Sequence, residues 1–387
     1  MGEPGPRLAR QAQATAGKWK LGLIVNPVAG LGGRVGLKGS DGLEIQRRAL
    51  ALGAVPQAAD RAAQALARLG PLANQFDLIA YPAEMGEAAA TAAGLAPTVI
   101  GAIQSGRTTA TDTRRAAGEM LALGVDLLLF AGGDGTARDV CQAVGQALPA
   151  LGIPAGVKIH SAVYATTPVA AGDLAALYLQ GKVTSRREAE VMDVDEEAVR
   201  QGTITAMLYG YLTIPFQREL VQSRKAPSGP GEAAAMDAIG CQVVDGMEPG
   251  RLYILGPGTT TRAIAARLGL AKTLIGVDVV LDGRLVAADA NEAQLLALVP
   301  GRPAQIVVTP IGGQGYLFGR GNQQISPAVI RAVGRHNVKV VSTPHKVNAL
   351  EGRPFLVDTG DPAVDRLLVG YVRVITGYGE QIVYRVS

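Results

Sequence analysis

The chain has 387 residues, of which 48% are apolar and 4% aromatic, and its formal net charge is +4. This length indicates two domains with aliphatic, alanine-rich cores. No run approaches the ~20 apolar residues needed to span a bilayer, so no membrane partner is expected. The mild, scattered positive charge neither demands nor excludes a nucleic acid, and it fits anionic small molecules equally well.

The N-terminus and the cysteines indicate the compartment. Residues 1–18 carry Arg7 and Arg10 but no apolar segment, so we predict a disordered leader rather than a signal peptide. Cys141 and Cys241 are far apart and lack metal-ligand spacing, which indicates reduced thiols in a cytoplasmic protein. The histidines His160, His336 and His345 lack metal-ligand spacing too, so no metal ligand is assigned.

The first half of the chain alternates apolar runs with helical segments, which predicts parallel βαβ units. Strands are expected at 20–25, 76–80, 98–101, 125–130 and 152–157. Helices are expected at 43–69, with a break near Gly53 and Pro56, from the Thr109–Asp112 capping box to about Gly124, and at 137–147.

From about Gly181 the pattern changes, because 186–194 and 203–208 alternate in the manner of antiparallel strands. Further strands are expected at 251–255, 306–309 and 338–341, and as a hairpin of 371–376 with 381–386. Helices are expected at 169–180, 231–244, 262–268, 293–298 and 326–335, with an Asp289–Glu292 capping box before the fourth. We predict domains at 19–165 and 166–387, with the last segment a candidate to return to the first domain.

Four glycine-rich loops follow predicted strands and precede helices, where an open α/β sheet binds ligands. The fourth follows the strand at 306–309 and comprises 310–315 and the polar glycine-rich stretch 319–324. The first, Asn26–Gly42, is neither Gly-x-Gly-x-x-Gly nor a Walker pattern. Its amides suit phosphate, with Arg34 and Lys38 as cationic candidates, and the alternative is a flexible surface loop. The third, Gly256–Thr261, offers hydroxyls and amides, and the alternative there is an ordinary N-cap.

The second turn, Gly132-Gly133-Asp134-Gly135-Thr136, places one carboxylate where helix amides favour phosphate. Negative charge beside a phosphate needs a reason, such as a Mg²⁺ ion or a proton to remove. The alternative is a tight turn with Asp134 as a local cap.

These turns resemble the NAD kinase, diacylglycerol kinase and phosphofructokinase group. The chain is most similar to the ATP-NAD kinase-like branch that includes acetoin-catabolism protein X. The resemblance implies an α/β fold with a Rossmann-like (phosphofructokinase-like) N-terminal domain and a C-terminal domain rich in antiparallel β-strands. It also implies transfer of the ATP γ-phosphoryl group to the 2′-hydroxyl of the adenosine ribose of NAD or NADH, with Mg²⁺. We therefore expect small-molecule nucleotides rather than a nucleic acid as partners, and a homo-oligomer.

The same resemblance implies that Asp134 is the general base. The residues that it implies for nucleotide binding are Asn26, Gly30, Gly32, Gly33, Lys38, Asp41, Gly132, Gly133, Gly135, Thr136, Gly258, Thr259, Thr260 and Thr261.

One departure from the family pattern concerns the acceptor. Typical NAD kinases have an Asn-Glu or Asn-Asp pair that grips the ribose, yet no asparagine lies between Thr136 and Gly256. The acidic cluster Asp193–Glu197 could replace it, bind metal, or be a solvated turn. The alternatives to an NAD kinase are therefore a kinase of the same fold for a lipid or polyol, and a nucleotide-sensing module without turnover.

Overall fold

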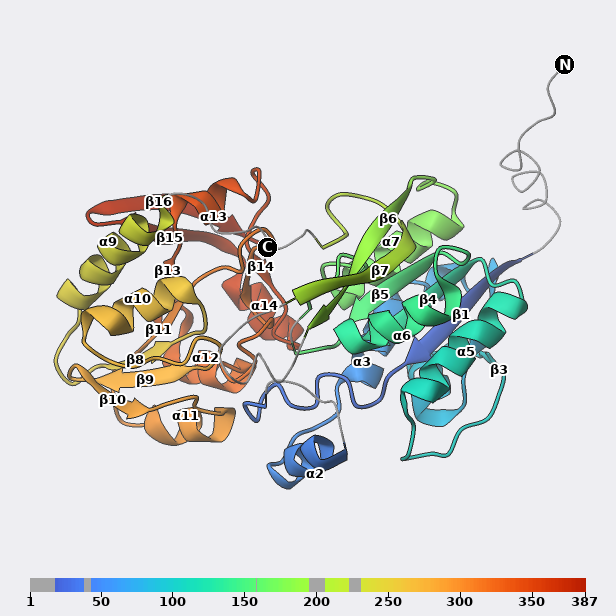
Figure 1. Cartoon of the computed structure of the whole chain (residues 1–387), viewed down its shortest axis with the longest axis horizontal. Helices are drawn as coiled ribbons and strands as arrows, with labels where there is room; N and C mark the ends of the chain where they lie inside the picture. Colours follow the sequence, from blue (N-terminus) through green and yellow to red (C-terminus); the bar gives the residue numbers. More distant parts are fainter. Residues whose placement is uncertain (1–17, 38–42, 158, 195–205, 223–230) are drawn as a thin grey trace, which may run out of the picture.

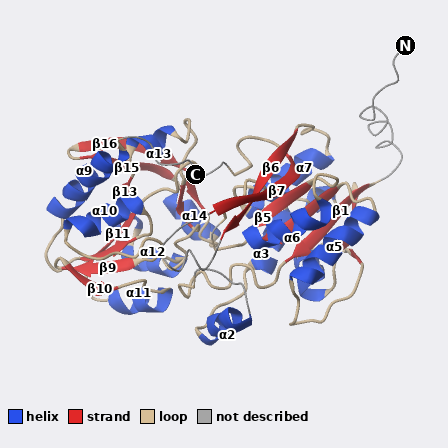
Figure 2. Cartoon of the chain, viewed as in Figure 1, coloured by secondary structure: helices blue, strands red, loops and turns tan. Residues whose placement is uncertain are grey.

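The computed structural model describes residues 18–37, 43–157, 159–194, 206–222 and 231–387. Figure 1 shows two domains side by side, with the N-terminal half of the chain on the right and the C-terminal half on the left. Figure 2 shows that each contains strands enclosed by helices. The leader predicted for residues 1–18 lies outside the described residues, except for Lys18.

The first sheet has five parallel strands in the order β3-β2-β1-β4-β5, which confirms the predicted Rossmann-like arrangement. Its strands are β1 (Trp19–Val25), β2 (Phe76–Ala80), β3 (Thr98–Val99), β4 (Leu127–Gly132) and β5 (Ala150–Pro154). All of β4 is buried, as is β1 from Leu21 onward. Strands covered on both faces read as continuous apolar runs, which is why the sequence predicted them.

Helices cover both faces of this sheet. The helices α3 (Ala58–Ala67), α4 (Glu87–Ala92) and α7 (Pro168–Leu179) pack together on one face, and α5 (Ala110–Ala122) packs with α6 (Asp134–Val144) on the other. The chain therefore leaves β1 toward one face and β4 toward the other. Where the connections after two adjacent strands leave toward opposite faces, a crevice forms at the carboxyl ends of the strands, and such sheets bind ligands there. The small helix α2 (Leu43–Ala51) stands apart at the edge of the molecule (Figure 1).

An antiparallel pair, β6 (Arg186–Val194) with β7 (Ala206–Pro215), follows the first sheet, as the alternating pattern predicted. Its residues Val191 and Leu212 are buried in the same hydrophobic cluster as the first sheet, which extends to Val221. The buried hydrophobic residues of the second domain begin at Ile239. The packing therefore changes from one core to the other after Val221, later than the boundary at 165 that we predicted, because α7 packs on α3 and β6 packs on α6.

The second sheet has seven strands in the order β10-β9-β8-β11-β13-β15-β16. The pairings at its two edges are antiparallel, as predicted, whereas the four central strands β8, β11, β13 and β15 are parallel. The strands are β8 (Leu252–Leu255), β9 (Asp278–Leu281), β10 (Arg284–Ala287), β11 (Ala304–Val308), β13 (Val338–Val341), β15 (Gly370–Gly377) and β16 (Glu380–Val386). The last segment forms β15 and β16 and stays in the second domain.

Both faces of the second sheet are also covered. Tyr253 and Leu255 of β8 pack with the buried residues of α9 (Glu232–Asp245) and α10 (Thr259–Arg267). Leu252 and Ile254 point the other way, into a cluster with α11 (Glu292–Leu298), α12 (Pro327–Val333) and α14 (Pro362–Leu368). In the sequence between β11 and β15, the chain also forms a short pair of strands and a short helix. The strands are β12 (Tyr316–Phe318) and β14 (Leu356–Val357), and the helix is α13 (Pro344–Asn348).

Two helix starts differ from the prediction in a way that matters for function. Helix α6 begins at Asp134 and α10 at Thr259, each a turn earlier than expected, because Gly133 and Gly258 are their N-cap residues. Asp134 and Thr259 therefore lie in the first turn of a helix rather than in a loop. Among the described residues, no helix is long and apolar enough to cross a membrane.

One of the two predicted capping boxes is confirmed, and the other is shifted. Thr109 and Asp112 form the box at the start of α5. At α11 the box is formed by Asn291 with Gln294 rather than by Asp289 with Glu292. Asp289 is instead a turn residue with a φ of +47°.

Candidate functional site

Asn26 joins the carboxyl ends of β1 and β4. Its backbone N–H donates to the Ala131 carbonyl at 2.9 Å, and its side-chain Nδ2 donates to Thr136 Oγ1 at 2.9 Å. Its Oδ1 accepts from the Val28 amide at 3.2 Å. Asn26 therefore ties the first glycine turn to the first turn of α6, and both it and Thr136 already have protein partners.

Asp134 is held by the loop that follows β5. Its Oδ1 accepts the Ser161 amide at 2.9 Å, and its Oδ2 accepts the His160 amide at 2.8 Å and lies 3.1 Å from His160 Nδ1. The Asp134 and His160 side chains are only 11% and 14% exposed. Asp134 is thus a well-oriented acceptor at a helix N-terminus, with an imidazole beside it.

The glycines around Asp134 permit close backbone packing. A Cβ on Gly132 would lie 2.3 Å from the Thr136 side chain, and one on Gly133 would lie 3.1 Å from the Gly156 Cα. Tyr164 donates its hydroxyl to the Gly133 carbonyl at 2.6 Å. Burial, and then the charge of Asp134, raise the pKa of Tyr164 well above its usual value, so this hydroxyl keeps its proton. Gly135 lies half-buried in the first turn of α6.

The first glycine turn runs between the two domains. Gly30 has a φ of +78°, and a Cβ there would lie 2.1 Å from the Ala155 carbonyl oxygen. Gly33 packs on Gln323, and the Glu292 amide donates to the Arg34 carbonyl at 3.1 Å. Leu31, Gly32 and Gly33 are buried, which does not fit the alternative of a flexible surface loop. Two of its predicted binding residues, Lys38 and Asp41, lie outside the described residues.

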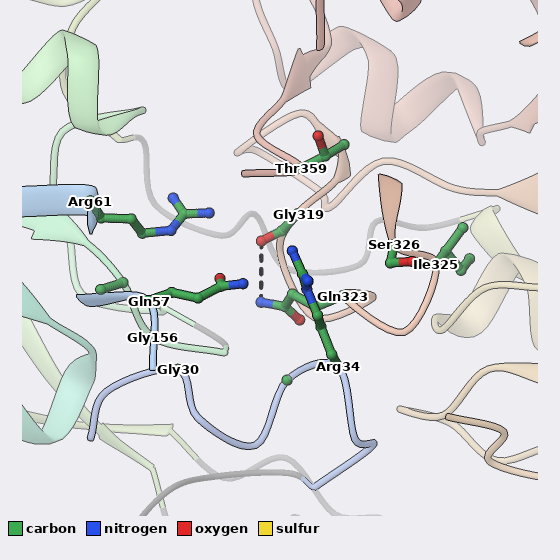
Figure 3. A pocket seen from close by; sticks show the side chains of 12 residues that line it. Gly30, Arg34, Gln57, Arg61, Gly156, Gly319, Gln323, Ile325, Ser326 and Thr359 are labelled. Carbon is green, nitrogen blue, oxygen red and sulfur yellow. Dashed lines mark hydrogen bonds between the residues drawn. The ribbon is translucent and has the colours of Figure 1, made fainter. Parts of the chain in front are cut away.

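A pocket lies where this turn meets the second domain (Figure 3). Arg61 and Gln57 point into it from the first domain, and Gln323 lies opposite them. It holds about 430 Å³ of empty space, part of which is open to solvent. The residues that line it are Gly30, Gly33, Arg34, Gln57, Arg61, Ala155, Gly156, Gly319, Gln323, Ile325, Ser326 and Thr359.

Buried charges stand behind one wall of this pocket. Arg61 Nη1 lies 2.8 Å from Asp358 Oδ2, and Arg320 Nη2 lies 3.0 Å from the same oxygen. These three side chains are 8%, 2% and 7% exposed for Arg61, Arg320 and Asp358 respectively. Burial raises the pKa of the neighbouring Asp365, although hydrogen bonds from Thr359 oppose this rise. One carboxylate is therefore shared by two guanidinium groups from different domains.

The third predicted turn lies elsewhere in the second domain. Thr261 Oγ1 donates to the Gly256 and Gly258 carbonyls at 2.6 and 3.0 Å, and Lys346 Nζ donates to Thr260 Oγ1 at 2.9 Å. Thr260 and Thr261 are fully buried, and Thr259 is half-buried. None of Gly258, Thr259, Thr260 and Thr261 is among the residues that line the pocket. The second domain instead contributes the segment from Gly319 to Ser326, together with Thr359.

Metal ligands are sparse among the described residues, where no group of three or more His, Cys, Asp or Glu side chains is arranged around a common point. Mg²⁺ commonly uses only one or two carboxylates and keeps several waters. Asp134 provides one carboxylate at the carboxyl end of β4, and a single carboxylate fits an ion that arrives with substrate phosphates. Of the acidic cluster Asp193–Glu197, the last three residues lie outside the described residues.

Several residues of this region were not singled out from the sequence. His160 was dismissed because it lacks metal-ligand spacing, yet its imidazole lies against Asp134. Arg61 lies in the alanine-rich helical segment at 43–69 and belongs to no motif. The polar glycine-rich stretch around Gln323 was the signal that pointed to this part of the second domain.

Comparisons with known proteins agree with this geometry. Residues 21–183 match the family model of the ATP-NAD kinase N-terminal domain, and residues 250–386 match that of the ATP-NAD kinase C-terminal domain. No curated protein matches the chain. The two matches follow one another in the expected order, cover most of the chain and include both sides of the pocket. The chain therefore belongs to the ATP-NAD kinase-like family and has the domains of a phosphotransferase.

Proposed function

We propose that this protein transfers the γ-phosphoryl group of ATP to the 2′-hydroxyl of the adenosine ribose of NAD or NADH, giving ADP and NADP or NADPH. The observation that carries the proposal is the position of Asp134. It is an oriented carboxylate at the amino end of α6, at the crevice between β1 and β4, in a chain that has both domains of the family.

Asp134 suits the role of proton acceptor. A ribose hydroxyl is a weak nucleophile, and a carboxylate within hydrogen-bond reach can take its proton as the oxygen attacks phosphorus. In that step a new P–O bond forms to the 2′-oxygen, and the bond between the γ-phosphorus and the bridging oxygen breaks to release ADP. The amides of His160 and Ser161 fix the carboxylate, so little reorganisation is needed when the substrate arrives.

The surrounding residues suit the rest of the reaction. Phosphoryl transfer depends mainly on positioning and on neutralising phosphate charge. The arginines that line the pocket, Arg34 and Arg61, can supply part of this neutralisation. Mg²⁺ that enters with ATP would supply the remainder, and Asp134 is the carboxylate at the amino end of α6 that could contact it.

The direct test is incubation of the purified chain with Mg²⁺-ATP and separate acceptors, namely NAD, NADH, diacylglycerol and simple sugars. We expect NADP or NADPH to form, in equal amount to ADP. Phosphorylation of the lipid or a sugar in place of the dinucleotide would contradict the acceptor assignment. ATP hydrolysis without any phosphorylated product would contradict transfer itself.

The role of Asp134 is tested by Asp134→Asn. We expect kcat to fall about 10²–10⁴-fold while ATP still binds, because only the base is lost. The asparagine amide would also face the Ser161 or His160 N–H, so some loss of stability is expected.

Asp278→Asn is a matched control for that loss of stability. Asp278 is also buried, and its oxygens accept the backbone amides of Thr273 and Asp289 at 2.7 and 2.6 Å. This variant should lose stability but keep kcat. Equal kcat in Asp134→Asn and the wild type would remove Asp134 as the base.

A further inference from the structure

The fourth glycine-rich loop, 310–315 and 319–324, reaches from the second domain to the first. It lies on either side of β12. In the first domain, the Val157 carbonyl oxygen accepts from the Gly321 amide at 3.0 Å and from Gln323 Nε2 at 2.8 Å. The second domain therefore holds the backbone of the first domain shortly after β5 ends.

Gln314, in the first part of this loop, makes a further contact to the same segment. Its Nε2 donates to the Ile159 carbonyl at 3.2 Å. Gln222, which follows the last residue of the first core, donates its Nε2 to the same oxygen at 3.1 Å. Each of these three residues is only 4% exposed, so the bonds are shielded from water. Two amide donors, one from each domain, thus converge on one carbonyl oxygen.

That carbonyl and the N–H that holds Asp134 belong to one peptide group. The C=O of Ile159 and the N–H of His160 lie in the same plane, because the peptide bond is planar. The His160 N–H donates to Asp134 Oδ2 at 2.8 Å. A bond that fixes the direction of the C=O therefore also fixes the direction of the N–H. Hydrogen bonds linked in such a chain also polarise one another, which makes the N–H a better donor to the carboxylate.

We propose that Gln314 is a positioning residue for Asp134 and that it acts through the Ile159–His160 peptide. The inference rests on the proposed function in taking Asp134 as the base. It goes beyond that function because the orientation of the base then depends on a residue of the opposite domain, 155 positions from Ile159 in the sequence. Docking of the second domain is therefore part of assembling the site, in addition to closing the pocket.

A purely structural role is the competing explanation for Gln314, since an amide that bridges two domains also stabilises their contact. The two roles predict different measurements. A structural contact changes the stability of the protein and, through the shape of the pocket, the KM values. A positioning contact changes kcat and the protection of the His160 N–H against exchange with solvent.

The test combines steady-state kinetics with hydrogen–deuterium exchange of the full chain. Gln314→Met keeps the length of the side chain and removes the donor. We expect kcat to fall about 3- to 10-fold, the value of one hydrogen bond expressed as a rate, with unchanged KM for ATP and NAD. The amides of His160 and Ser161 should exchange faster than in the wild type, because the peptide that holds the carboxylate is less restrained.

Gln222→Met is the second variant, and it keeps the test decisive if Gln314→Met does not fold. It removes the other donor to the Ile159 oxygen without removing a contact from the second domain, and should have the same two effects. Asn337→Leu is the matched control, because Asn337 also donates a side-chain amide to a backbone carbonyl, that of Val333, at 2.7 Å. This control should lose stability but keep kcat and the exchange of His160 and Ser161.

Several results would overturn the proposal. One is an unchanged kcat in Gln314→Met, whether or not the two amides exchange faster. Another is a lower kcat with unchanged exchange, since the effect would then not pass through the Ile159–His160 peptide. A rise in KM in place of the fall in kcat, or equal effects in Asn337→Leu, would indicate a structural contact only.

Failure of this inference can be told apart from failure of the proposed function. If the wild type phosphorylates a compound other than NAD, the acceptor assignment fails, and the kcat ratio measured with that compound tests Gln314. If no compound is phosphorylated, the proposed function fails, and faster exchange of His160 and Ser161 in Gln314→Met still supports the contact. If NADP forms equally fast in the wild type and both glutamine variants, the positioning role fails and the proposed function stands.

Discussion

Asp358 holds the two domains together through charge, and its removal should be more damaging than the removal of either arginine. Arg61 lies on α3 of the first domain, whereas Arg320 and Asp358 belong to the second domain. Asp358→Asn leaves two buried guanidinium groups without a counter-charge. Arg61→Met leaves Asp358 with its bond from Arg320 at 3.0 Å, and the methionine stem fills most of the vacated space.

These differences give an expected order of stability. Leaving a buried charge unpaired costs about 3–5 kcal/mol, so Asp358→Asn should lower the free energy of unfolding by that amount. Arg61→Met should cost about 1–3 kcal/mol, the value of hydrogen bonds to a charged group. Asp173→Asn is the control, because Asp173 pairs with Arg68 at 2.7 Å on the surface and should cost under about 1 kcal/mol.

Urea denaturation of the three variants, followed by both fluorescence and circular dichroism, measures this order. In Asp358→Asn we also expect the two probes to report separate transitions, because the charge contact between the domains is lost. A cost for Asp358→Asn equal to or below that of Arg61→Met would refute the reasoning. It would mean that solvent or Asp365 already compensates the arginines.

Three further outcomes are expected. Gly30→Ala should lower both Tm and ATP affinity, because its φ is +78° and a Cβ would lie 2.1 Å from a carbonyl oxygen; Gly53→Ala, at a φ of +81° in open space, should cost only about 1–2 kcal/mol in stability. His160→Ala should lower kcat about tenfold with an unchanged KM for ATP in steady-state assays, because Asp134 loses one orienting contact; an unchanged kcat would contradict this. Burial tends to raise the pKa of Asp112, but hydrogen bonds from Thr109 at the start of α5 outweigh it and hold this pKa below its usual value. Its stabilising effect is therefore present above about pH 4 and lost on acidification, so the difference in Tm between the wild type and Asp112→Asn should shrink as the pH falls below 4.

The sequence predicted most of the first domain because its strands are buried on both faces and stand out as apolar runs between helices. The break in the long helix was also predicted, since Gly53 and Pro56 separate α2 from α3. In the second domain the hairpin of β9 with β10 was missed, because each strand has only four residues and no clear alternation. The parallel centre of the second sheet could not be predicted, since strand order depends on packing between distant segments.

The site was predicted only where it is local in sequence. Glycines and an aspartate between a strand and a helix identified the turn at Asp134. The pair of Arg61 with Asp358 joins residues 297 positions apart, and neither residue has a neighbour in sequence that signals the contact. Charges in an alanine-rich helix look like a solvated face until the second domain covers them.

The acceptor remains the part of the site that the residues specify least. The structure brings Asn291 and Glu292 beside the first glycine turn, where the Glu292 amide bonds the Arg34 carbonyl. The Asn291 side chain, however, caps helix α11, because its Oδ1 accepts the Gln294 amide at 2.9 Å. Proximity alone therefore does not make it a ribose ligand.

The loop after β5 connects the acid to the pocket. Gly156 lines the pocket and packs on Gly133, and a few residues later the amides of His160 and Ser161 hold Asp134. In the proposed reaction, a nucleotide phosphate bound against Gly156 would contact the residue that packs on Gly133, directly before Asp134. We therefore expect phosphate binding to affect the orientation of the proposed base. In this proposal the base and the phosphate contacts depend on neighbouring residues at the carboxyl ends of β4 and β5, whereas recognition of the acceptor must come from residues elsewhere.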